Sequence, residues 1–258
     1  MTASVHETIL RLGAMQHTFE VGGWNYTHDG HAKGLRVGRI LIATTNRGKL
    51  REIRRALEGV SVRWLSLEDL HHVPEPEETG RTFAENALLK ARYYAAASDL
   101  PTVAEDSGLA IDALGGQPGV ESARYPGATY PDKFRGLYRE LAPHPRPWTA
   151  RFFCSLAFVG QAEGRGPKAE DKKGLTLASG LGPLALPVLF TCEATVQGEI
   201  AESPRGTYGF GYDPIFYYPP YSSTLGEVDE ARKLAVSHRG KAFRQFRDWL
   251  QQRRGSLP

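Results

Sequence analysis

The sequence predicts an α/β fold in which helices flank a mixed β-sheet. Two observations support this class. Short apolar runs rich in β-branched residues alternate with helical patterns early in the chain, and two longer strand-like runs follow later. Of the 258 residues, 41% are hydrophobic and 24% are charged, as in an ordinary soluble globular protein. The length favours one large domain or two lobes.

The predicted fold opens with a strand, a polar loop and a helix. Residues 39–43 are an apolar run, and Leu50, Ile53 and Leu57 then recur at helical spacing. The segment between them reads Thr44, Thr45, Asn46, Arg47, Gly48 and Lys49. Free N–H groups and the dipole at a helix N-terminus attract anions, so this segment is suited to a phosphate. The simpler alternative is a helix cap with a solvated lysine.

A second strand and a long helix come next. Residues 60–65 can form the strand. Residues 79–97 are rich in Ala and Leu, and Thr82 with Glu85 matches a capping box at the start of the helix. This alternation of strand and helix is what indicates an α/β sheet.

Two adjacent carboxylates follow an apolar run that has no other polar residue near its end. Strand-like runs at 102–105 and 109–114 are separated by a polar segment that contains Asp106, directly after Glu105. We therefore expect a carboxylate at a strand end, where α/β folds place ligands, although acidic loops are usually only solvated. Such oxygen ligands suit Mg²⁺, which proteins hold through one or two carboxylates together with substrate phosphates and waters.

The second half of the chain predicts the antiparallel part of the sheet. Residues 150–159 and 193–201 are typical of the long strands of a hairpin. The segment between them, 160–187, is rich in Gly, Pro and Lys, and we interpret it as a mobile insertion. A closing helical pattern at Phe243, Phe246 and Leu250 is expected to pack on the sheet.

Residues 1–36 lack sustained periodicity and are predicted to be an N-terminal extension, either a real tail or the product of a misassigned start codon. The predicted domain then spans residues 37–258. No run approaches the roughly 18 apolar residues of a membrane span. The only cysteines, Cys154 and Cys192, are too few for a disulfide framework, so we expect a cytoplasmic protein that binds no membrane. The net charge of +3 leaves its partners open.

Two segments near the end of the chain are suited to a planar ligand. Residues 206–216 interleave three glycines with aromatic side chains, which lets rings and backbone wrap a base, although a tight turn with core-facing rings is the alternative. Lys233 precedes the run 237–240, in which His and Arg offer donors for purine edges or phosphate. The chain has neither a complete P-loop nor an HExxH motif, and its GxGxxA match at 180–185 follows no strand.

Taken together, these segments resemble the inosine triphosphate pyrophosphatase family over nearly all of residues 39–250. The matching segments, in order, are 43–49, 77–80, 82–87 with Lys90 and Ala91, 104–109, 114–119, 122–125, 209–214, and Lys233 with 237–240. Each alone is weak, but eight in the same order form a highly specific combination.

The resemblance implies a hydrolase that splits ITP, dITP or XTP between the α- and β-phosphates with Mg²⁺. The products are the nucleoside monophosphate and pyrophosphate, and the reaction cleanses the nucleotide pool. It also implies an elongated, two-lobed unit around a central mixed sheet, commonly a homodimer, that binds no nucleic acid. The alternatives are a related Maf-like nucleotide pyrophosphatase with another base preference, or a non-catalytic module that binds nucleotides or nucleic acid.

The same resemblance implies a role for each matching residue. Asp106 would accept the proton of the attacking water, and Glu77 and Asp106 would hold the metal. The implied substrate-binding residues are Thr44, Thr45, Asn46, Arg47, Gly48, Lys49, Lys90, Ser107, Phe210, Gly211, Tyr212, Asp213, Lys233, His238 and Arg239. Glu105 stands where many relatives have Asp, and we give it no metal role.

Overall fold

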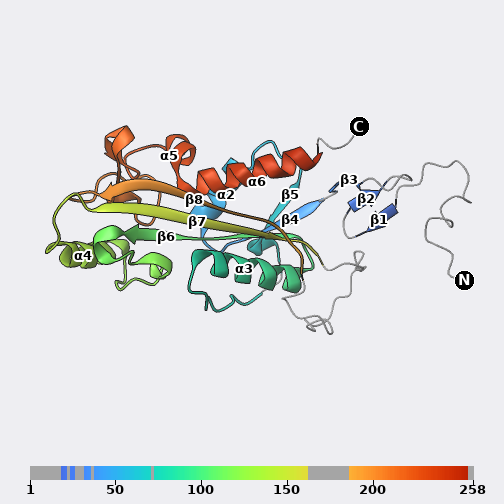
Figure 1. Ribbon diagram of the computed structural model, residues 1–258, viewed down its shortest axis with the longest axis horizontal. Helices are drawn as coiled ribbons and strands as arrows, with labels where there is room; N and C mark the ends of the chain where they lie inside the picture. The colour runs from blue at the N-terminus through green and yellow to red at the C-terminus, as the bar shows by residue number, and fades with distance from the viewer. Residues whose placement is uncertain are drawn as a thin grey trace, which may run out of the picture.

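The computed structural model describes residues 19–21, 24–26, 32–35, 38–70, 73–161 and 186–254. Seven strands form one mixed sheet: β4 (Arg39–Ala43), β5 (Arg63–Ser66), β6 (Thr102–Ile111), β7 (Thr149–Val159), β8 (Val188–Ile200), β9 (Phe216–Tyr218) and β10 (Ser223–Thr224). The helices around this sheet are α2 (Arg47–Ala56), α3 (Phe83–Ser98), α4 (Tyr130–Leu141), α5 (Glu230–Val236) and α6 (His238–Arg254). The predicted α/β class is confirmed, and Figure 1 shows the expected elongated shape, with α3 and α4 at different points along the long strands.

The sheet has the strand order β10-β9-β8-β7-β6-β4-β5. β4 pairs in parallel with β5 and β6, whereas β6 to β10 pair antiparallel. The strand predicted at 39–43 is confirmed as β4, and the hairpin as β7 and β8. The strands predicted at 60–65 and 193–201 exist with other limits, Arg63–Ser66 and Val188–Ile200.

One strand, β6, replaces the two strands predicted at 102–105 and 109–114. The polar residues between them do not break it, because β6 pairs with β7 over ten consecutive positions without a shift. The prediction that Asp106 lies at a strand end is therefore wrong. Asp106 does lie beyond the last pair between β4 and β6, Ala43 with Ala104, so β4 leaves this part of β6 uncovered.

Helices α2 and α6 cover one face of the sheet and α3 covers the other (Figure 1). Alternate residues of β4 point to opposite faces of the sheet and pack against different helices. Ile40 and Ile42 pack in one apolar cluster with Phe246 of α6, and Leu41 and Ala43 pack in another with α3. The predicted C-terminal helix is thus confirmed, and it packs on the sheet.

Helix α3 begins at Phe83, directly after the predicted cap Thr82. The Thr82 hydroxyl accepts a hydrogen bond from the Glu85 amide at 3.1 Å. The Glu85 carboxylate, however, accepts from the amide of Arg81 at 2.6 Å rather than from that of Thr82. Only one half of the predicted capping box therefore forms.

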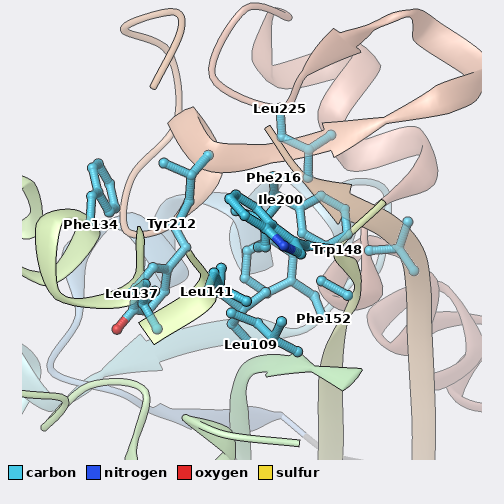
Figure 2. Packing of buried hydrophobic residues seen from close by; sticks show 14 of the residues in the cluster. Leu109, Phe134, Leu137, Leu141, Trp148, Phe152, Ile200, Tyr212, Phe216 and Leu225 are labelled. Carbon is cyan, nitrogen blue, oxygen red and sulfur yellow. The ribbon is translucent and has the colours of Figure 1, made fainter. Parts of the chain in front are cut away.

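The second lobe has an apolar core of its own, in which α4 packs against the segment that follows β8. Figure 2 shows Leu137 and Leu141 of α4 in the same cluster as Trp148, Phe152 and Phe216. All five side chains are buried. This packing holds residues 206–216, the segment that interleaves glycines with aromatic side chains, in a fixed position beside β6.

Three short strands lie within the predicted extension at residues 1–36: β1 (Phe19–Val21), β2 (Trp24–Tyr26) and β3 (Ala32–Leu35). They form a small antiparallel sheet, which the weak periodicity of the sequence did not indicate. The predicted insertion lies between β7 and β8, but residues 162–185 of it are outside the described residues. Within the described ranges, no helix is long and apolar enough to cross a membrane.

Candidate active site

A cleft beside β6 consists of two adjoining cavities. The polar cavity, about 600 Å³, is lined by residues that include Thr44, Thr45, Asn46, Lys49, Glu77, Glu78, Lys90, Glu105, Asp106, Ser107 and Arg124. The aromatic cavity, about 80 Å³, is lined by residues that include Tyr130, Phe152, Phe210, Gly211, Tyr212, Asp213, Lys233, His238 and Arg239. Four residues line both cavities: Asn46, Lys49, Ser107 and Ala123. The cleft thus brings together most of the residues predicted from the sequence.

The loop after β4 presents the start of α2 to the polar cavity. The Asn46 side chain caps the helix by accepting from the Lys49 amide at 3.0 Å, and the Thr44 hydroxyl accepts from the Asn46 amide at 3.2 Å. The first turn of α2 has no acidic residue. Lys49 is not solvated, because its Nζ lies 2.8 Å from Glu105 Oε1. The positive end of the helix and an oriented ammonium group therefore face the same cavity.

Asp106 faces α3, where three polar side chains surround it. Lys90 Nζ donates to Asp106 Oδ1 at 3.0 Å, and Asn86 Nδ2 donates to Oδ2 at 3.3 Å. Lys90 also donates to Glu78 Oε1 at 2.6 Å. Burial raises the pKa of the Asp106 carboxyl above its ordinary value, although the Lys90 charge opposes this shift.

Glu105, the preceding residue, projects to the opposite face of the sheet, toward α2 and α6. Its Oε1 lies 2.8 Å from Lys49 Nζ and 3.5 Å from Arg239 Nη2. Burial favours the neutral acid, but the charges of Arg239 and Lys49 outweigh it and hold the pKa of Glu105 well below its ordinary value. Two neighbouring carboxylates thus have pKa values shifted in opposite directions, which is typical of sites where acidic groups have different roles.

A buried ion network supports the aromatic cavity. Glu52 of α2 lies 2.7 Å from Lys233 Nζ and 2.6 Å from Arg239 Nη1. Lys233 also pairs with Asp213, and Arg239 donates to the Ser107 hydroxyl at 2.8 Å. The side chains of Glu52, Lys233, Asp213 and Arg239 are each only 3% exposed. Both cations are therefore held rigidly at the wall of the cavity.

His238, the first residue of α6, is buried and lines the aromatic cavity. Its ring stacks on Phe152, with the ring centroids 4.8 Å apart. Burial, together with the charge of Arg239, keeps the pKa of His238 well below its ordinary value, so the imidazole is neutral near pH 7. Its Nδ1 has no hydrogen-bond partner among the residues that the structure describes. A buried polar atom without a partner is costly, and a ligand would satisfy it.

Phe210 closes the aromatic cavity from the side of α2. A Cβ atom on Gly48 would lie 2.7 Å from the Phe210 ring, so only glycine allows this close approach. Lys233 Nζ lies 4.5 Å from the ring centroid, within the range of a cation–π contact. The Phe210 amide donates to Asp213 Oδ2 at 2.7 Å, which fixes the turn that carries the ring.

Two of the predicted substrate-binding residues, Arg47 and Gly48, line neither cavity. The Arg47 side chain is 88% exposed and pairs with Glu68 at 3.4 Å, so the structure does not bring it into either cavity. Gly48 contributes by making room for Phe210. Glu77 lines the polar cavity and is exposed, close in sequence to Glu78.

The structure adds functional candidates that sequence reasoning missed, above all Glu52 and Asn86. A signal for Glu52 was present, because positions 49, 52, 53 and 56 share one face of α2 and Glu52 is the acidic residue on that face. Asn86 lies inside the motif at residues 82–87, but the motif does not indicate that the Asn86 side-chain amide contacts Asp106, 20 residues further along the chain.

Comparison with known proteins identifies the relatives of this chain. A model of the Ham1 family matches residues 40–249. A dITP/XTP pyrophosphatase from Geobacter sulfurreducens is 41% identical over 215 residues, which cover 82% of this chain and 96% of that protein. Another from Geobacillus kaustophilus is 44% identical over 209 residues, which cover 79% and 90%. The structure of a HAM1 protein from Coxiella burnetii matches with a TM-score of 0.69 and 36% identity, covering 83% of this chain and 98% of that one.

Proposed function

This chain belongs to the Ham1 family, and from that premise we propose that it hydrolyses ITP, dITP and XTP to the nucleoside monophosphate and pyrophosphate. Such an enzyme removes non-standard purine nucleotides from the nucleotide pool. Family membership argues against the two alternatives, a Maf-like pyrophosphatase and a non-catalytic binding module.

The observation that carries the proposal is a pair of buried polar atoms without partners among the described residues, His238 Nδ1 and the donor Arg239 Nε, beside the aromatic cavity that both residues line. A neutral imidazole has one N–H donor and one acceptor, whereas a guanidinium has donors only. Hypoxanthine and xanthine present a 6-oxo acceptor where adenine presents an amino donor. Adenine would leave buried donors unpaired, and a buried site discriminates strongly against such a loss. Phe210 supplies a flat surface for the ring system.

The triphosphate would occupy the polar cavity. Lys49 and Lys90 supply positive charge there, and the start of α2 supplies backbone donors. Asp106 would take the proton of the attacking water, and its raised pKa makes it a stronger base than an exposed aspartate. Asn86 and Lys90 hold the two Asp106 oxygens in place, so the carboxylate is oriented before the water arrives.

The residues of the polar cavity also fit Mg²⁺. Glu77 and Asp106 offer hard oxygen ligands, and Mg²⁺ usually takes only one or two carboxylates while phosphates and waters complete its coordination. When bound, the ion would neutralise charge on the phosphates.

Three further statements stay predictions. The homodimer rests on the family resemblance, and the cytoplasmic location rests on the small number of cysteines, which are free. The separate status of residues 1–36 rests on the absence of motif residues there.

The test is a pyrophosphate-release assay with ITP, dITP, XTP, ATP and GTP, with and without Mg²⁺. We expect rapid, Mg²⁺-dependent release from the first three and slow release from ATP; guanine shares the 6-oxo group, so GTP separately measures whether the cavity tolerates a 2-amino group. In the variant His238→Gln this preference should shrink, whereas His144→Gln, which lies outside both cavities, should match the wild type. Orthophosphate as the sole inorganic product, or equal rates with all five nucleotides, would contradict the proposal.

A further inference from the structure

Tyr130, the first residue of α4, lines the aromatic cavity but belongs to none of the motifs that predicted the site. It is 38% exposed, so it stands where this cavity meets solvent. Its ring meets Tyr212 edge-on at a centroid distance of 5.4 Å and lies 6.1 Å from Phe134. Figure 2 shows Phe134 and Tyr212 beside each other at the margin of the apolar cluster. The ring of Tyr130 is therefore held in one position at the rim.

The hydroxyl of Tyr130 is left free by this packing. It lies next to Gly211, where a Cβ atom would be 3.5 Å away. It has no hydrogen-bond partner among the residues that the structure describes. By contrast, the Tyr212 hydroxyl donates to the Ser122 carbonyl at 2.8 Å, and the Tyr138 hydroxyl donates to the Ala201 carbonyl at 3.0 Å. Burial raises the pKa of Tyr130, so its hydroxyl stays protonated and can donate.

The two cavities indicate which part of a nucleotide this hydroxyl meets. Tyr130 lines the aromatic cavity and not the polar cavity, which holds the lysines and carboxylates suited to phosphates. Residues common to both cavities, such as Asn46 and Ser107, mark the passage between them. A nucleotide with its phosphates in the polar cavity therefore places its nucleoside part beside Tyr130.

Building on the proposed function, we propose that Tyr130 is a further substrate-binding residue whose hydroxyl donates a hydrogen bond to an oxygen or nitrogen acceptor of the bound nucleoside. The partly exposed ring lines the same cavity as the buried side chains of His238 and Arg239. Tyr130 thus adds a contact to the sugar or the base that the family motifs do not contain.

The test compares Tyr130→Phe with the wild type in steady-state pyrophosphate release from ITP and dITP, and in inhibition by tripolyphosphate. Phenylalanine keeps the ring contacts and removes only the hydroxyl. We expect KM to rise about 2- to 10-fold, as for the loss of one neutral hydrogen bond, with kcat changed less than about 2-fold. The inhibition constant of tripolyphosphate, which has no nucleoside, should stay the same. A rise in KM for ITP alone identifies the ribose 2′-hydroxyl as the acceptor, and a rise for both nucleotides identifies another acceptor on the nucleoside.

The matched control is Tyr138→Phe, which removes a hydroxyl from the same helix outside both cavities. It should leave KM unchanged. Unchanged KM values for both nucleotides in Tyr130→Phe would overturn the proposal, as would a tripolyphosphate inhibition constant that rises as much as KM. Failure of the proposed function is distinguishable, because the wild-type protein itself would then release no pyrophosphate from ITP.

Discussion

Replacing Glu52 with glutamine removes the buried carboxylate that two cations of the aromatic cavity share. In the native protein its oxygens lie 2.7 Å from Lys233 Nζ and 2.6 Å from Arg239 Nη1. Positive charges outweigh the effect of burial and hold the pKa of Glu52 below its ordinary value, so the side chain is ionised at neutral pH. Glutamine has nearly the same shape and no charge, so the variant isolates the electrostatic contribution.

The network around Glu52 is balanced in charge. It contains three carboxylates and three cations, namely Glu52, Glu105, Asp213, Lys49, Lys233 and Arg239. Removal of one partner from a buried ion pair typically costs about 3–5 kcal/mol, because the other charge stays buried without compensation. Lys233 keeps Asp213, and Arg239 keeps Glu105 and Ser107, so we expect a loss near the lower limit, about 3 kcal/mol. Such a loss is a large part of the total stability of a typical protein.

The assay is urea denaturation at pH 7, followed by tryptophan fluorescence. The control is Glu230→Gln on α5. Its half-buried carboxylate lies 3.4 Å from Arg51 and 3.5 Å from Arg55, two exposed arginines, so this change should cost less than about 1 kcal/mol. KM for ITP should also rise in Glu52→Gln, because Arg239 loses an anchor. If Glu52→Gln and Glu230→Gln destabilise the protein equally, by less than about 1 kcal/mol, the charge of Glu52 does not stabilise the buried network.

Three further outcomes follow from the site. Asp106→Asn should lower kcat about 100- to 10,000-fold while calorimetry still detects binding of inosine nucleotide; wild-type turnover would exclude Asp106 as the base. His238 has a folded pKa well below its ordinary 6.5, so as pH falls below this value the unfolded chain binds a proton that the native state does not. The free energy of unfolding should therefore decline by up to about 1.4 kcal/mol per pH unit, and a urea series on His238→Asn, compared with the wild type, should lack this component. Deletion of residues 1–36 should leave kcat unchanged, and a large loss would show that the extension takes part in the reaction.

The sequence predicted the elements whose signals are local. The strand at 39–43 and the helix that follows are defined by apolar periodicity within about 20 residues. The interior of β6 was missed because a segment that contains Asp106 and Gly108 has the composition of a turn. Its strand conformation depends on pairing with β7, whose first residue is Thr149, and on ion pairs that make buried carboxylates tolerable.

The residues of the site also fall into those that local motifs predict and those that only long-range contacts reveal. Motifs located Lys49, Asp106 and His238, because each stands in a short, recognisable run. No motif could locate the anchoring role of Glu52, whose partner Arg239 is 187 residues away. Tyr130 was missed for a similar reason, since only the packing of α4 within the second lobe brings it to the cavity.

Glu105 and Asp106 are neighbours in the chain, yet they serve opposite sides of the sheet. A single-residue insertion or deletion in β6 ahead of them would exchange their surroundings, sending the carboxylate held by Lys90 toward Arg239 instead. The unshifted pairing between β6 and β7 therefore determines which side of the sheet each of the two carboxylates faces. Because Arg239 of α6 contacts both neighbours of Asp106, Glu105 and Ser107, the register of this one strand links recognition of the base to cleavage of the phosphoanhydride bond.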